Sequence, residues 1–161
     1  MDEPNDFDDP DAAALAAEVL DTCVFHAVRR CAGMLGRLYG RHFAAAGLTP
    51  GQFLLLSLIA EGQAGSAADL ARQSGLERST LTRSLRTLAA AGWIAEDAAS
   101  GLRRRPLLTE AGEAKLHEGL ACWRAAQADL LQWLPRDTDA AARLQLRSLR
   151  TAARAAGGAD L

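Results

Sequence analysis

The chain has 161 residues, of which 49% are hydrophobic and only 5% aromatic, and its formal net charge is −2. This length suits one domain with its own core, and an alanine-rich, aromatic-poor composition favours packed helices. No apolar run is as long as a membrane span, which needs about 18 residues, and no basic segment followed by an apolar stretch indicates a signal peptide. The three cysteines form no Cys-x-x-Cys pair. We therefore expect a cytoplasmic protein with reduced thiols and no membrane partner.

The charge is distributed unevenly along the chain. The first 21 residues carry eight acidic and no basic side chains, whereas the other 140 carry 18 basic and 12 acidic ones, a net charge of +6. Residues 1–14, with Pro4 and Pro10, are predicted to form a disordered acidic tail. The small overall charge therefore conceals a basic body and does not exclude a nucleic-acid partner.

Two helices are expected after the tail. The first runs from about Leu15 or Thr22 to Ala46, and Gly47 ends it. Its apolar residues alternate steps of four and three, which predicts a heptad-like seam: Val24, Val28, Cys31, Leu35 and Leu38. The second covers Pro50–Glu61, and its inward-facing residues are predicted to be Phe53, Leu54, Leu56 and Leu58.

The segment Ser66–Thr109 predicts a helix, a tight turn, a second helix and a hairpin, which is the order of a winged helix-turn-helix. Ser66 is a favourable N-cap, Asp69 completes an acidic variant of the capping box, and Gly75 ends the first helix. The second helix is expected from about Glu77 to Ala91, with its end at Gly92.

The second helix has two different faces. Leu81, Leu85 and Leu88 form an apolar stripe by their spacing. The opposite side and its flanks carry Ser, Thr and Arg but no acid after Glu77, a composition that suits contacts with phosphates and base edges better than plain solvent exposure. The candidate DNA-binding residues here are Ser79, Thr80, Thr82, Arg83 and Arg86. The alternative is an ordinary solvated face.

A hairpin follows, with Trp93–Glu96 and Leu102–Leu108 as strands and residues 97–101 as the turn. Arg103, Arg104 and Arg105 are consecutive in the return strand. Strand alternation sends Arg103 and Arg105 to one face and Arg104 to the other. Three adjacent positive charges favour a contact with phosphates or with a narrow minor groove.

Three short motifs are shared with one bacterial protein family: Leu48–Phe53 (LTPGQF), Ala90–Trp93 (AAGW) and Leu108–Gly112 (LTEAG). Together with the helix-turn-helix they resemble the MarR family of transcriptional regulators, over about residues 20–155. The resemblance implies a mainly α fold, with terminal dimerisation helices and one small β-hairpin wing. Family members often carry Asp-x-Arg in the wing, whereas Ser100–Arg105 reads SGLRRR, which leaves open which arginine enters the groove.

The rest of the chain is expected to form two further helices, from Glu110 to about Leu134 and from near Asp137 to Ala156, separated by Pro135. The resemblance implies that 15–47 and 110–156 form a helical dimerisation region around the DNA-binding region 48–109. A homodimer also fits DNA recognition, because one recognition helix covers only half of a two-fold site. The alternative is that the terminal helices only cover the monomer's own core.

The candidate effector or redox residues are Cys23, His26, Arg30 and Cys31. The resemblance implies two kinds of effector: aromatic acids, or peroxide, which OhrR-type members sense through a cysteine early in the first helix, in a stretch similar to Cys23–Ala27. Buried structural cysteines are the preferred alternative. Cys23 and His26 lie one helical turn apart, but no cysteine or histidine has the tight spacing of a zinc module, so neither a metal site nor a cofactor is assigned.

The predicted function is sequence-specific binding of double-stranded DNA. We expect a homodimeric repressor that a small molecule or thiol oxidation releases from an inverted-repeat operator. The alternatives are a peroxide, metal or metalloid sensor of the same fold, and a winged-helix protein-interaction module that does not bind DNA. An enzyme is not expected, because the sequence has no nucleophile elbow, P-loop, GxGxxG or paired-carboxylate motif.

Overall fold

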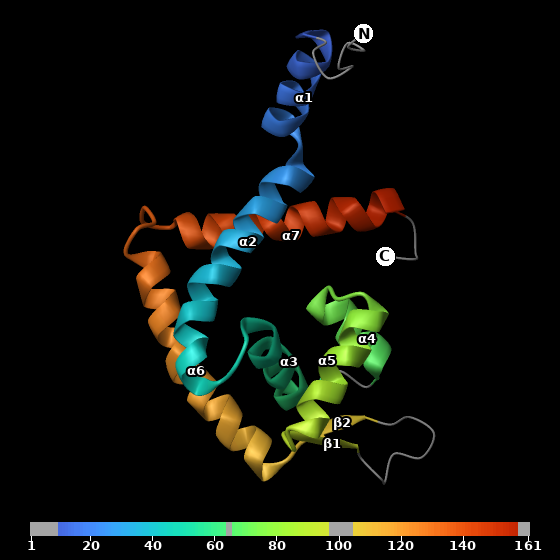
Figure 1. The fold of residues 1–161 in the computed structure, drawn as a ribbon, viewed down its shortest axis with the longest axis vertical. Coiled ribbons are helices and arrows are strands. Elements are labelled where there is room, and N and C mark those ends of the chain that lie inside the picture. Colours follow the sequence, from blue (N-terminus) through green and yellow to red (C-terminus); the bar gives the residue numbers. More distant parts are fainter. Residues whose placement is uncertain (1–9, 64–65, 97–104, 158–161) are drawn as a thin grey trace, which may run out of the picture. The chain divides into compact units, whose positions relative to one another are not determined.

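The structure is a computed structural model that describes residues 10–63, 66–96 and 105–157. Its contacts divide the chain into two units, residues 1–38 and 39–161, which are treated separately here. Helices account for most of the described residues, and two short strands form one sheet (Figure 1). This confirms the predicted mainly α fold with a single β-hairpin.

The first unit contains α1 (Pro10–Thr22) and most of α2 (Val24–Phe43). The expected single helix is thus interrupted at Cys23, where the His26 ring nitrogen Nδ1 lies 3.0 Å from the carbonyl oxygen of Leu20. Residues 10–14 of the expected tail are helical, because proline suits a first helical turn and the alanines that follow favour helix; residues 1–9 lie outside the described residues. Several large apolar side chains of this unit are exposed: Leu15, Val19, Leu20, Val24, Phe25 and Val28.

The second unit begins with the end of α2 and continues through η1 (Ala44–Ala46) to α3 (Pro50–Glu61). Thr49 caps α3: its hydroxyl accepts the Gln52 N–H, and the Gln52 side chain accepts the Thr49 N–H. Burial raises the pKa of Tyr39, whose hydroxyl stays protonated at neutral pH and donates to Gln127 of α6 (Glu110–Leu131). This bond joins helices that are far apart in the sequence.

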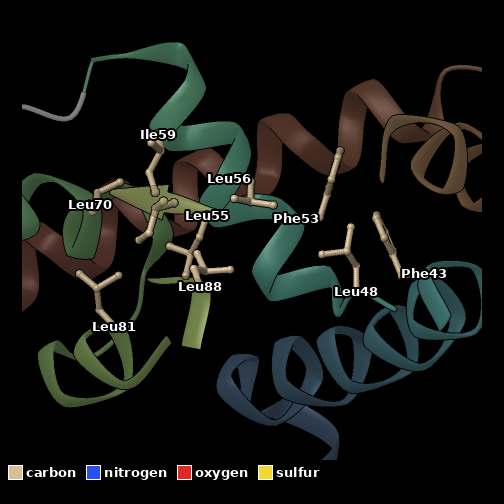
Figure 2. Close-up of a cluster of buried hydrophobic side chains, with 10 residues drawn as sticks. Phe43, Leu48, Phe53, Leu55, Leu56, Ile59, Leu70, Leu81 and Leu88 are labelled. Carbon is tan, nitrogen blue, oxygen red and sulfur yellow. The ribbon is translucent and has the colours of Figure 1, made fainter. Parts of the chain in front are cut away.

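The hydrophobic core forms around α3, which lies between α6 on one side and α4 and α5 on the other (Figure 1). Figure 2 shows Leu55 of α3 with Leu70, Leu81 and Leu88, and Phe43 and Leu48 beside Phe53. Of the predicted inward residues of α3, Leu54 is wrong: it is 47% exposed, whereas Leu55 is 1% exposed. The error arose because a nearly continuous apolar run has no clear period.

The sheet pairs β1 (Ile94–Glu96) with β2 (Pro106–Leu108) in antiparallel register, with Ile94 opposite Leu108. The base of this sheet is hydrogen-bonded to the start of α6. The Thr109 N–H donates to the carbonyl of Trp93, and the Thr109 hydroxyl donates to the carbonyl of Gly92 while accepting the Gly112 N–H. The motif Leu108–Gly112 therefore joins the wing to α6.

The helix α6 packs through small residues. Gly112, Gly119 and Ala126 are its buried residues and recur every seven positions. A Cβ atom at Gly119 would lie 2.4 Å from the Phe53 ring, so the helices approach too closely for any side chain there. The helix ends at Leu131, earlier than the expected Leu134.

The last helix, α7, spans Thr138–Gly157 and contains no buried residue. Asp137, which precedes it, has a φ of 67°, so the backbone turns at the residue where the helix was expected to begin. The large apolar side chains of α7 are exposed: Leu144, Leu146 and Leu149. One face of this helix is therefore uncovered in the single chain.

Candidate nucleic-acid interface

The candidate interface is built on α4 (Ala67–Ser74) and α5 (Arg78–Ala90). The Ser66 hydroxyl accepts the Asp69 N–H, as predicted for an N-cap, and it donates to the Asp69 carboxylate. Gly75 ends α4 with a φ of 68°, in the left-handed region that glycine tolerates. The turn between the helices is short, because Glu77 is already the N-cap of α5.

The end of α5 is a Schellman motif. The Trp93 N–H donates to the carbonyl of Leu88, the Gly92 N–H donates to the carbonyl of Ala89, and Gly92 has a φ of 73°. The chain leaves the helix in this turn and enters β1 directly. The predicted end at Gly92 is confirmed, and the wing follows the recognition helix without a linker.

The two predicted faces of α5 are present. Leu81 and Leu88 are 2% and 0% exposed, and Leu85 is half-buried against the same core. The opposite face carries the five candidate DNA-binding residues, all of which are exposed: Ser79, Thr80, Thr82, Arg83 and Arg86. The core thus holds α5 by one side and leaves this polar side open to solvent.

The hydroxyl groups on α5 divide into two classes. Those of Thr82, Ser84 and Thr87 donate to backbone carbonyls four residues earlier. Within the described chain, the hydroxyls of Ser79 and Thr80 make no such bond. Because their protons are not committed to the helix, these two side chains at the start of α5 are the better hydrogen-bond donors to an external acceptor.

The arginines of α5 also have no partner. Among the residues that the structure describes, Arg78, Arg83 and Arg86 form no ion pair, and all three are exposed. Arg78 was not among the predicted DNA-binding residues, but it is the first residue of α5, beside Ser79, and belongs to the same exposed surface. Three exposed arginines with no ion-pair partner among the described residues give this face an excess of positive charge.

The wing arginines are placed only in part. Arg103 and Arg104 lie outside the described residues. Arg105 is half-buried, and its Nη2 donates to the carbonyl oxygen of Gly62 at 2.6 Å. The structure therefore gives Arg105 a hydrogen-bond partner within the protein, at the C-terminal end of α3.

The candidate effector residues are dispersed over the first unit. Cys23 and His26 are half-buried, whereas Arg30 and Cys31 are exposed on α2. The third cysteine, Cys122, is half-buried beside the core of the second unit. Among the described residues, no group of three or more His, Cys, Asp or Glu side chains is arranged to hold a metal ion. No single described helix is long and apolar enough to cross a membrane.

Comparison with known proteins gives one consistent result. The sequence profile described as MarR family matches residues 48–97, which include α3, α4, α5 and β1. No curated protein sequence matches the chain.

Several solved structures are similar over nearly their whole length. The transcriptional regulator MosR of Mycobacterium tuberculosis shares 32% identity, with a TM-score of 0.74, over 84% of this chain and 98% of that one. MosR in complex with DNA gives 33% identity and a TM-score of 0.69, over 83% and 98%. A MarR family protein of M. tuberculosis bound to salicylic acid gives 27% identity and a TM-score of 0.62, over 78% and 95%.

Proposed function

Because the chain belongs to the MarR family of transcriptional regulators, we propose that it is a homodimeric repressor of an inverted-repeat operator, acting in the cytoplasm and released by a small-molecule ligand or by thiol oxidation. The observation that carries this proposal is the outward face of α5. It combines three exposed arginines and two hydroxyl groups for which the described part of the chain offers no ion-pair or hydrogen-bond partner.

The chemistry of that face supports sequence-specific binding. Arginine can bond O6 and N7 of guanine with two parallel hydrogen bonds, while serine and threonine bond phosphates or base edges. Arg83 and Arg86 are in the middle of the exposed face and are assigned to base edges. Ser79, Thr80 and Thr82 are assigned to phosphates or bases near them, and Arg103, Arg104 and Arg105 to the wing's contribution.

The proposed dimer follows from two observations. One recognition helix reads only a half-site, and the two half-sites of a dimer lie about 34 Å apart, one turn of DNA. The exposed leucines of α7 supply an apolar face that the single chain leaves uncovered. A second copy covers it in the proposal, as in closed two-fold assemblies generally.

The proposed release has two candidate routes. A related regulator binds salicylic acid, which supports a small aromatic acid as ligand, with Arg30 and His26 as candidate contacts.

The other route is oxidation at Cys23, which lies between α1 and α2 and is partly accessible. If this route operates, peroxide should release DNA from the wild type and from Cys31→Ser. The variant Cys23→Ser should bind DNA normally and should keep it after peroxide treatment. If the wild type holds its operator after mild peroxide treatment, the thiol route is excluded.

Fluorescence anisotropy with an operator fragment and a random fragment, across a salt series, tests the main proposal. The DNA flanking the gene is the first source of operator candidates. Arg83→Ala and Arg86→Ala should each cost about 1–3 kcal/mol on the operator and much less on random DNA. Arg124→Ala, an exposed arginine on α6, is the matched control and should bind normally.

These measurements distinguish sequence-specific DNA binding from nonspecific binding and from a module that binds protein instead of DNA. Equal losses on both fragments would restrict these arginines to phosphate contacts. If the wild type binds no DNA even at low salt, the chain is a winged-helix protein-interaction module instead.

A further inference from the structure

We infer that Arg105 is a positioning residue: it fixes the base of the wing to the C-terminal end of α3, and its contribution to DNA binding is made through the position of the wing. This inference rests on the proposed DNA-binding function. It departs from the assignment of all three wing arginines to DNA, because the structure gives Arg105 a bond inside the protein.

The acceptor is well suited to a cation. Gly62 is the C-cap of α3, with a φ of 75°. The carbonyl groups at a helix C-terminus lack partners within the helix and carry its partial negative charge. The guanidinium of Arg105 donates to the Gly62 carbonyl over 2.6 Å, a charge-assisted hydrogen bond between residues 43 positions apart. It is thus a tertiary contact rather than part of the hairpin.

The place of Arg105 in the wing explains why this bond matters. Arg105 immediately precedes β2, so it is the point at which the described part of the return strand begins. By alternation its side chain shares a face with Leu107. Both residues line a groove of about 380 Å³ whose other walls are α3 and α6, with Ile59 and Leu116 among its apolar residues. On the other face of β2, Leu108 packs against the core, so the wing base is held from one face by Leu108 and from the other by the Arg105 bond.

Gly62 offers a way to disturb Arg105 without removing its charge. A Cβ atom at position 62 would lie 3.0 Å from Nη2 of Arg105, closer than an ordinary contact. In Gly62→Ala the guanidinium must therefore shift by a few tenths of an ångström, which weakens its bond to the Gly62 carbonyl without removing its charge. Gly47 is a matched control, because it has a similar φ of 62° but nothing within 4 Å of its Cβ position. Gly47→Ala carries the same backbone strain and leaves the wing untouched.

The two roles of Arg105 predict different results. A direct phosphate contact depends on the charge, so Arg105→Ala would weaken DNA binding and reduce the salt slope by about one unit, while Gly62→Ala would bind normally. A positioning role depends on the bond. Arg105→Ala and Gly62→Ala should then weaken operator binding alike, by about tenfold each, with the same salt slope as each other. Their combination should add nothing further.

The experiment measures operator affinity and its salt dependence for the full-length variants, at a temperature where circular dichroism shows each to be folded. Arg105→Lys should restore part of the affinity, since an ammonium group can donate to the same carbonyl, and Gly47→Ala should bind as the wild type does. Normal binding by Gly62→Ala together with weak binding by Arg105→Ala would overturn the inference, as would normal binding by both. Failure of the wild type to bind any DNA would instead refute the proposed function.

Discussion

The winged helix-turn-helix region, residues 48–109, and the last helix, α7, use their apolar residues in opposite ways. The first region contains nine of the eleven described buried hydrophobic side chains, including Leu56, Leu70 and Leu88, each 0% exposed. In α7 no residue is buried, and Leu144 is 53% exposed. The winged helix-turn-helix region thus has its core within one chain, whereas the leucines of α7 are exposed in the single chain and are the surface that the proposed second copy would cover.

The strongest test of this contrast removes α7. A chain that ends at Arg136 should lose the proposed dimer, since it lacks the exposed leucines, yet keep the core around α3. Sedimentation should show a monomer, and circular dichroism should show the remaining helices. Its affinity for an inverted repeat should fall to that of a single half-site.

Two further variants control for the truncation. Leu144→Asp combined with Leu149→Asp should dissociate the dimer without shortening the chain, and deletion of residues 1–9 should leave it intact. A stable dimer after removal of α7 would show that this helix is not the interface.

The next largest effect is expected where α3 and α6 approach each other. Gly119→Ala places a methyl group 2.4 Å from the Phe53 ring position and should reduce the free energy of unfolding by about 1–3 kcal/mol. Chemical denaturation of the full-length protein measures it. Gly51→Ala on α3, which has nothing within 4 Å of its Cβ position, should instead be neutral or slightly stabilising. Equal effects would mean that the close packing described here is absent in solution.

A smaller effect is expected from the cap of α4. Ser66→Ala removes an acceptor for the Asp69 N–H and should cost about 1 kcal/mol of stability. Ser66→Asp, which keeps an N-cap oxygen, should lose little of it. Thermal unfolding distinguishes these variants, and an unchanged midpoint for Ser66→Ala would show that the turn is held by its packing alone.

The smallest effect is expected on α7. Arg143 and Asp139 form an exposed pair at 2.8 Å, one helical turn apart, and Arg143→Ala should change stability by less than about 0.5 kcal/mol. Thermal unfolding at two protein concentrations measures it. A larger loss that grows on dilution would place this pair in the dimer interface and would extend the proposed interface beyond the leucines.

What the sequence predicted well was locally determined. The recognition helix was expected over Glu77–Ala91 and occupies Arg78–Ala90, because its period of leucines and the glycine at its end, Gly92, are close together in the sequence. The helix expected to begin at Glu110 likewise begins there. At these positions the residues that determine where a helix begins or ends are neighbours in the sequence, so the boundary can be predicted without knowledge of the fold.

What the sequence did not predict depends on distant residues. Leu54 and Leu55 are adjacent in a run of leucines, and the elements that pack against α3, which come later in the sequence, decide which of the two is buried. The close packing at Gly119 has no signal apart from a small residue every seven positions. Likewise, the alternation rule gave Arg105 a face of the hairpin but not its acceptor, because Gly62 belongs to another element.

The fastening at Thr109 has a mechanical consequence. This residue bonds Gly92 and Trp93, the second and third residues after the end of α5, and it is also the N-cap of α6. A Cβ atom at Gly112 would lie 1.9 Å from the carbonyl oxygen of Trp93, so the start of α6 is packed tightly against the backbone that follows α5. We therefore expect α5 and α6 to move as one rigid unit, with the wing at the point where they are joined. A tilt of α6 should therefore move α5 with it, and in the proposed homodimer the positions of the two α6 helices would set whether both recognition helices reach successive turns of the same DNA.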